Sequence, residues 1–155
     1  MADRLRAINE VQQAGIIARR RRGESPKVEL SLPHECRVGY FPQDDGSVRL
    51  GLAFVPDDLQ GNGIGTRLVQ SATADAKRQG ATVLRGAITS SAGLHLVEKT
   101  FGDTARVEDP SGTSTPLSML RREVRDSADT RSGIRFTVAL ERVNTDGWEL
   151  PVETG

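Results

Sequence analysis

The stretch "LQGNGIGTRL", residues 59–68, places three glycines within five positions and then continues as an apolar, helix-like pattern. It follows the nearly all-apolar run of residues 48–55, which predicts a central strand covered on both faces. After it, apolar residues recur every four positions from Ile64 to Ala76, which predicts a helix ending at Gly80. The sequence therefore predicts a glycine-rich turn between a buried strand and a helix.

Three phosphate-binding patterns could account for the glycine turn. A P-loop needs a lysine directly after its last glycine, and the chain has Thr66 there. A dinucleotide-binding loop needs a further glycine at that position and an acidic residue after the next strand, where residues 86–91 read "GAITSS". The third pattern, Gln/Arg-x-x-Gly-x-Gly/Ala, matches Gln60 to Gly65. Backbone N–H groups at such a helix N-terminus favour a diphosphate; the alternative is a turn that merely feeds a helix.

The rest of the chain predicts an α/β fold with one mixed sheet. The expected elements are a helix over 2–20, strands over 25–33, 36–41, 48–55, 81–88 and 134–143, and a shorter helix over 90–102. Asp45-Gly46 predicts a hairpin turn. The crossover helix after residues 48–55 implies one parallel strand pair in an otherwise antiparallel sheet. Residues 104–124 fit either strand–turn–strand or, over 117–124, a helix.

Composition narrows the class of protein. The 155 residues fit one core, and 21 basic against 21 acidic side chains predict no broad affinity for nucleic acid or membranes. A single cysteine, Cys36, excludes an internal disulfide and suits a reducing, cytoplasmic setting. Arg19–Arg22 are interpreted as solvated cations at the end of the first helix, with nucleic-acid binding as the alternative.

From the glycine loop outward the sequence resembles the GNAT N-acetyltransferase superfamily. "LAFVPDDLQGNGIGTRLV" is similar to that family's central strand, pyrophosphate loop and helix, and the likeness extends over roughly residues 48–124. The resemblance implies a GNAT-like acyl-CoA N-acyltransferase fold over residues 1–125, with a parallel strand 4/5 pair that splays apart. Residues 126–155 are then a linker and strand extension that packs on the same domain or on a partner subunit. Residues 134–143 would in the second case pair two copies.

The resemblance also implies where acetyl-CoA, the expected co-substrate, would bind. Its pantetheine amides would pair with N–H groups near Ala53, Phe54 and Val55, and the N–H of Phe54 is the expected oxyanion donor. The other expected cofactor contacts are Gln60, Gly61, Asn62, Gly63, Ile64, Gly65, Thr66 and Ser90.

The catalytic acid and base are not assigned by the sequence. Family members often carry a tyrosine acid on the second helix, and the matching position here is Val97. The only tyrosine, Tyr40, lies elsewhere, and His95 is expected on another face of that helix, at the surface. Asp57 and Asp58 could order a water.

Two functions remain open from the sequence. The first is acetyl transfer from acetyl-CoA to an amine whose identity the residues do not reveal. The alternative is a degenerate, non-catalytic GNAT-fold module in a larger assembly, which the missing tyrosine and an abbreviated N-terminal half favour.

Overall fold

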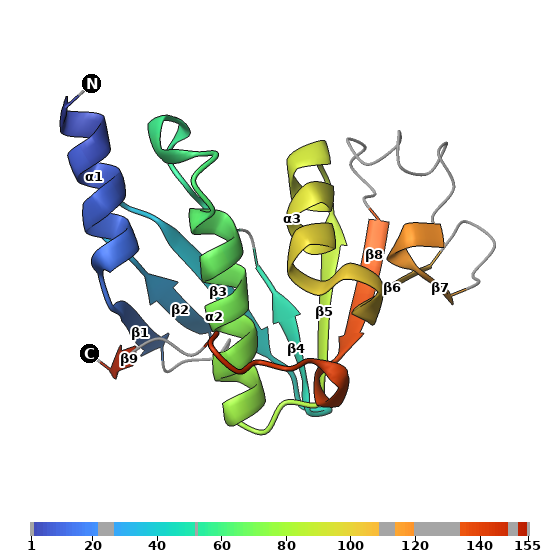
Figure 1. The fold of residues 1–155 in the computed structure, drawn as a ribbon. Coiled ribbons are helices and arrows are strands. Elements are labelled where there is room, and N and C mark those ends of the chain that lie inside the picture. Colours follow the sequence, from blue (N-terminus) through green and yellow to red (C-terminus); the bar gives the residue numbers. More distant parts are fainter. Residues whose placement is uncertain are drawn as a thin grey trace.

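The computed structural model describes residues 2–21, 27–51, 53–108, 114–119, 134–148 and 152–154 (Figure 1). Its helices are α1 (Ala2–Gln13), α2 (Ile64–Arg78) and α3 (Ser91–Phe101), with short 3-10 turns η1 (Asp57–Leu59), η2 (Gly102–Thr104), η3 (Leu117–Met119) and η4 (Leu140–Arg142). Its strands are β1 (Ile16–Arg21), β2 (Lys27–Ser31), β3 (Arg37–Pro42), β4 (Ser47–Leu50), β5 (Val83–Ile88), β6 (Ala105–Glu108), β7 (Ser114–Pro116), β8 (Ile134–Ala139) and β9 (Val152–Thr154).

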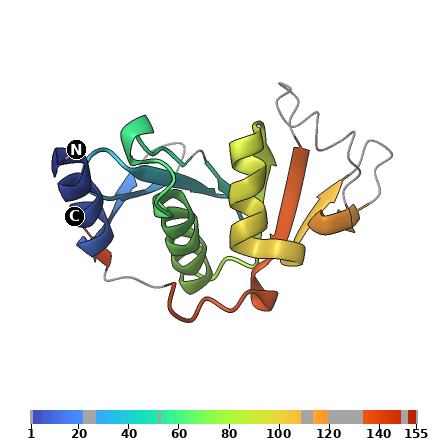
Figure 2. The same cartoon turned by 45° about the horizontal axis from the view of Figure 1, so that its top comes forward.

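The strands form one sheet in the order β7-β6-β8-β5-β4-β3-β2-β1-β9. β4 and β5 run parallel, as do β1 and β9, while the other neighbouring pairs are antiparallel. The predicted mixed, mostly antiparallel sheet with a central parallel pair is therefore confirmed. All three α-helices lie on one face of the sheet, here called the front face (Figures 1 and 2). No helix in the part of the chain that the structure describes covers the opposite, rear face.

The core lies between the front face and the helices. α2 packs on β2 and β3, and α3 packs on β5 and β6. Strand alternation sends one side chain in two to this face, and those side chains are buried. They include Val28, Leu30, Val38, Tyr40, Val48, Leu84, Ile88, Ala105, Val107, Ile134, Phe136 and Val138. Each fully buried leucine or valine contributes about 1.5–3 kcal/mol, so this layer is the main source of stability.

The structure confirms the predicted end of α2 at Gly80 and the predicted start of α3 at Ser90. Gly80 has a left-handed φ of 96° and donates its N–H to Lys77 O, while Ala81 donates to Ala76 O at 3.1 Å. These two bonds form a Schellman motif that stops α2 where the glycine predicted it. α3 begins at Ser90, whose Oγ accepts the N–H of Gly93 at 3.0 Å.

The predicted helix over residues 2–20 is wrong beyond Gln13. The chain leaves the helix before Gly15, and β1 pairs with β2 from Ile17 opposite Ser31 onward. Arg19 to Arg21 therefore lie in a strand and are no helix cap, while Arg22 lies outside the described residues. The carbonyls at the end of α1 are instead satisfied from α2, because Arg67 donates to Val11 O and Ala14 O at 2.5 Å each.

The predicted strand over residues 134–143 forms but cannot bind a second copy edge to edge. β8 ends at Ala139 and lies between β5 and β6, so ladders within the chain use both of its edges. The proposed homo-oligomer contact through this strand is therefore wrong in that form. The following segment instead reaches the helices, where Lys77 Nζ donates to Val143 O at 2.8 Å and the Trp148 ring lies against Phe101.

Within the ambiguous region 104–124 the structure describes two strands, β6 and β7. β6 and β7 pair antiparallel, and residues 117–119 form a 3-10 turn, while residues 120–124 lie outside the described residues.

None of the helices described is both long enough and apolar enough to cross a bilayer.

Candidate functional site

β4 and β5 stop pairing halfway along β5. Their ladder joins residues 47–49 to residues 83–85. Beyond it, β5 continues to Ile88 in pairing with β8, whereas the chain after β4 bonds to β3 through Phe54 and Arg37. Within the described residues no ladder joins 53–55 to 86–88. We call this divergence, with residues 53–55 on one arm and 86–88 on the other, the β4/β5 fork.

A one-residue bulge shapes the first arm of the fork. Gly51 donates its N–H to Gly39 O at 2.7 Å, and the next contact pairs Phe54 with Arg37. Between these two contacts, two residues of the later strand face one residue of β3, and this extra residue inverts the side-chain alternation. Phe54 consequently shares the rear face with Arg37, whose guanidinium lies 5.3 Å from its ring centroid.

The bulge also determines which backbone N–H groups can bind a ligand. Phe54 donates its N–H to Arg37 O at 2.7 Å and accepts the N–H of Arg37 at 2.9 Å. The expectation that Phe54 supplies the oxyanion donor is therefore corrected, because that N–H already has an acceptor. Adjacent residues of a strand direct their N–H groups to opposite edges, so the N–H of Val55 points into the fork, while the N–H of Ala53 lies within the bulge. Neither of these two N–H groups has an acceptor among the described residues.

The glycine loop ends in an uncapped helix N-terminus. Gly61 and Gly63 have left-handed φ values of 82° and 76°, which glycine adopts without strain. Gly63 is the N-cap of α2, no side chain caps it, and the first helical bond runs from Arg67 N to Gly63 O at 3.0 Å. The N–H groups of residues 61–66 have no acceptor in the described part of the chain. They form a concentrated set of donors at the positive end of the helix dipole.

Side-chain amides hold this loop in shape by occupying its carbonyls. Gln60 Nε2 donates to Val55 O at 3.0 Å and to Asp57 Oδ1 at 3.2 Å. Asn62 Nδ2 donates to Leu59 O at 3.0 Å and to Gln60 O at 3.1 Å. The side chains of Gln60 and Asn62, both predicted cofactor contacts, thus brace the loop. The backbone donors of the loop remain for a ligand.

The glycines leave room beside these donors. A Cβ atom at Gly61 or Gly63 would have no other atom within 4 Å. A Cβ at Gly65 would lie 3.7 Å from Leu96 Cδ1 and 3.9 Å from Val55 Cγ2. The loop is therefore open toward solvent at its first two glycines, whereas α2, α3 and Val55 close together at the third.

Of the residues considered for proton transfer, Tyr40 and Val97 are buried, whereas His95, Asp57 and Asp58 are exposed. Tyr40 is buried and donates its hydroxyl to Asp75 Oδ2 at 2.5 Å, which ties β3 to α2. Val97, at the position of the family's tyrosine, is buried, and His95 is exposed as expected. Asp57 and Asp58 are exposed in η1. The Oγ of Ser90 caps α3 by accepting a backbone N–H. The predicted contact between Ser90 and the cofactor stays a prediction.

The only cysteine is not an activated nucleophile. Cys36 is fully buried, and burial raises the pKa of its thiol, helped by the negative charge of Asp58.

A separate hollow of about 410 Å³ lies near the other end of β5, where Val83, Thr137 and Arg142 line it. The fork and the glycine loop contribute no residue to that hollow.

Comparison with known proteins shows which fold the chain has. No family model and no curated protein sequence matches the chain. A solved structure assigned as an acyl-CoA N-acyltransferase of Klebsiella pneumoniae matches with a TM-score of 0.53 and 12% identity, over 74% of this chain and 72% of that one. A GNAT-family acetyltransferase of Staphylococcus aureus Mu50 gives 0.51 and 13%, over 75% and 68%. Tetrahymena GCN5 gives 0.51 and 11%, over 77% and 71%. The chain therefore has the fold of the GNAT N-acetyltransferases.

Proposed function

We propose that the chain is an N-acyltransferase that transfers an acetyl group from acetyl-CoA to an amine. The observation that carries this proposal is the juxtaposition of two sets of N–H groups without a described acceptor. One set lies at the N-terminus of α2, and the other lies on the arm of the fork that leads into it. A diphosphate needs donors of the first kind, and an extended chain of amides needs donors of the second.

The loop can hold a diphosphate without a basic side chain. Residues 61–66 offer several backbone donors, and the helix dipole adds about half a positive charge at the same point. Gly61 and Gly63 permit close approach because no side chain stands between the backbone and the ligand. The match of Gln60–Gly65 to the pyrophosphate pattern supports the same placement.

The fork supplies donors for the acyl chain and the reacting carbonyl. In the overall reaction a C–N bond forms and the C–S bond of the thioester breaks, with the sulfur leaving with the electron pair and the amine losing a proton. We assign the stabilisation of negative charge on the carbonyl oxygen to the N–H of Val55 or Ala53. A thiol is a good leaving group, so the absence of a tyrosine at position 97 does not prevent transfer.

The second candidate is a non-catalytic module. It is favoured by Val97, which buries an apolar side chain where the family places its acid, and by Tyr40, which is held by Asp75 in the core. In that case the chain would bind CoA without turnover, or would serve only as an interaction domain.

For the enzyme we favour the cytoplasm, since a lone buried cysteine suits a reducing compartment.

Calorimetry with acetyl-CoA tests the site directly. We expect acetyl-CoA to bind in the micromolar range. Gly63→Asp should abolish this binding, because a carboxylate at the N-cap would occupy the position of the diphosphate and repel its negative charge. Gly80→Asp is the matched control, since Gly80 also has a left-handed φ and open space but lies at the other end of α2. Absence of binding to the unaltered protein would refute the proposal. Binding without thiol release across a panel of amines would favour the module.

A further inference from the structure

Four arginines surround the β4/β5 fork on the rear face. Arg49 and Arg85 are the last paired residues before the strands diverge. Arg37 lies opposite Phe54 on the β3 side, and Arg135 lies opposite Ala87 on the β8 side. All four residues are exposed. Although the whole chain has a formal net charge of zero, the rear rim of the fork is thus bounded on three sides by positive charge.

The rear face is also the side from which an acceptor can reach the fork. On the front, α2 and α3 lie over the sheet, and Gly65 of α2 lies near the side chains of Val55 and Leu96. On the rear, no helix of the described chain covers the sheet. This step rests on the proposed function: if the acyl donor is held by α2 at the front, the attacking amine arrives from the rear.

Contacts within the protein orient these guanidinium groups without neutralising them. Arg37 stacks on Phe54 at 5.3 Å and Arg49 stacks on Phe41 at 4.8 Å from the ring centroid. A contact of this kind leaves the positive charge of the guanidinium in place, so each group can still pair with a carboxylate.

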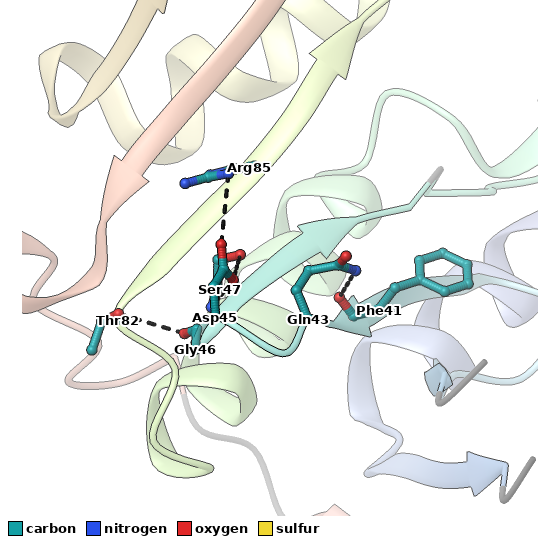
Figure 3. Close-up of polar contacts among 7 residues, drawn as sticks. All are labelled: Phe41, Gln43, Asp45, Gly46, Ser47, Thr82 and Arg85. Atoms are coloured by element: carbon teal, nitrogen blue, oxygen red, sulfur yellow. Dashed lines mark hydrogen bonds and ion pairs between the residues drawn. The ribbon is translucent and has the colours of Figure 1, made fainter. Parts of the chain in front are cut away.

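Carboxylates in the described part of the chain leave most of this charge uncompensated. Arg85 Nη1 is 3.9 Å from Asp45 Oδ2, with side chains 56% and 58% exposed, and such a pair contributes little (Figure 3). The other carboxylates that strand alternation places on this face, among the described residues, are Glu29 and Glu108. They lie on β2 and β6, the strands that flank the four strands carrying the arginines, and no ion pair between them and the four arginines is among the described contacts.

We propose that the acceptor is an acidic peptide whose reactive amine is flanked by carboxylates that pair with Arg37, Arg49, Arg85 and Arg135. The four arginines lie on four adjacent strands, so they extend over about 14 Å at the usual strand spacing. One carboxylate cannot bridge that distance, whereas an extended peptide of about four or five residues can. A lysine-rich acceptor would be repelled by the same charges.

The test compares three pentapeptides, each with one central lysine flanked by glutamates, alanines or arginines. Thiol release from acetyl-CoA gives kcat/KM for each peptide, and fluorescence anisotropy of labelled peptides gives their affinity without any acetyl-CoA. We expect the glutamate peptide to exceed the arginine peptide by about 10-fold or more in both measurements. The double variant Arg85→Gln/Arg135→Gln should bring this ratio close to one while the Kd for acetyl-CoA stays unchanged. Arg142→Gln, an exposed residue outside the fork, should keep the ratio.

The outcomes separate this inference from the proposed function. If acetyl-CoA binds but the arginine peptide reacts as well as the glutamate peptide, the acidic acceptor is refuted and the acyltransferase stands. If acetyl-CoA does not bind, the acyltransferase fails, and the anisotropy ratio alone decides whether the rear face selects acidic peptides. A single-stranded oligonucleotide that binds more tightly than the glutamate peptide, and loses this affinity in the double variant, would replace the peptide as the partner.

Discussion

Phe54 and Arg37 exchange two backbone hydrogen bonds, with N···O distances of 2.7 and 2.9 Å. Because this pair faces β3, the N–H of Val55 faces the fork. We predict that replacing the Val55 amide by an ester, through incorporation of the hydroxy-acid analogue of valine, lowers kcat by about 10²–10³-fold. The change removes one donor and leaves the side chain intact. The rate of thiol release in single-turnover experiments measures it.

The same replacement at Phe54 is the matched control. It removes the bond to Arg37 O, so it should cost about 1 kcal/mol of unfolding free energy while leaving the catalytic rate nearly unchanged. A larger loss of activity at Phe54 than at Val55 would mean that the bulge does not direct the catalytic donor. An equal loss at Ala53 would instead place the donor two residues earlier.

Tyr40 is predicted to serve stability and not catalysis. Its hydroxyl donates to Asp75 at 2.5 Å in the core, and Tyr40→Phe leaves that buried carboxylate with one donor fewer. We expect a loss of about 1–3 kcal/mol in urea unfolding, with the Kd for acetyl-CoA unchanged. In an Asp75→Asn background the same substitution should cost less, because the hydrogen bond lost there is to a neutral acceptor. A selective fall in kcat with unchanged stability would show that the phenol acts on the substrate.

Local patterns in the sequence were sufficient for the centre of the fold. The four-residue spacing from Ile64 to Ala76, the stop at Gly80 and the Asp45-Gly46 turn depend on neighbours along the chain. These features are encoded in short windows, and the structure has each of them where the pattern predicted it. The parallel β4/β5 pair followed from them, because a crossover helix joins its strands.

Features that depend on distant partners could not be predicted in this way. Alanine and arginine in residues 18–21 favour a helix locally, but pairing with β2 makes them a strand. The insertion of β8 between β5 and β6 depends on contacts across many residues. A glycine at position 51 is a weak sign of a bulge, but the extra residue that turns Phe54 to the rear is visible only in the register with β3. That register also places the ring of Phe54 beside Arg37 on the rear face.

Gly86 is predicted to be required for packing within the fork. A Cβ atom there would lie 2.6 Å from two ring atoms of Phe136, and this ring is buried. Gly86→Ala should therefore cost about 1–3 kcal/mol in urea unfolding. In a Phe136→Leu background the same substitution should cost clearly less, because the ring that it meets is gone. Equal costs in both backgrounds would show that backbone conformation, and not the ring, requires the glycine.

Stability should depend on pH through Asp45 at the β3–β4 turn. Its Oδ1 accepts the hydroxyl of Ser47 at 2.5 Å and the N–H of Ser47 at 3.0 Å (Figure 3). These bonds, the hydroxyl first, hold the pKa of Asp45 below its ordinary value of 3.8. Since the folded-state pKa is lowered, the stabilisation is complete above the ordinary value and is lost as pH falls through the lowered one.

Asp45→Asn should therefore destabilise the protein at neutral pH, and its difference from the unaltered protein should shrink as the pH falls below about 4. Asp44→Asn removes the same formal charge from the same turn without removing a bond to Ser47, so its effect should be smaller at neutral pH. Urea unfolding of the three proteins from pH 7 down to pH 3 measures both differences. A difference between Asp45→Asn and the unaltered protein that stays constant over this range would mean that the bonds to Ser47 do not depend on the carboxylate charge.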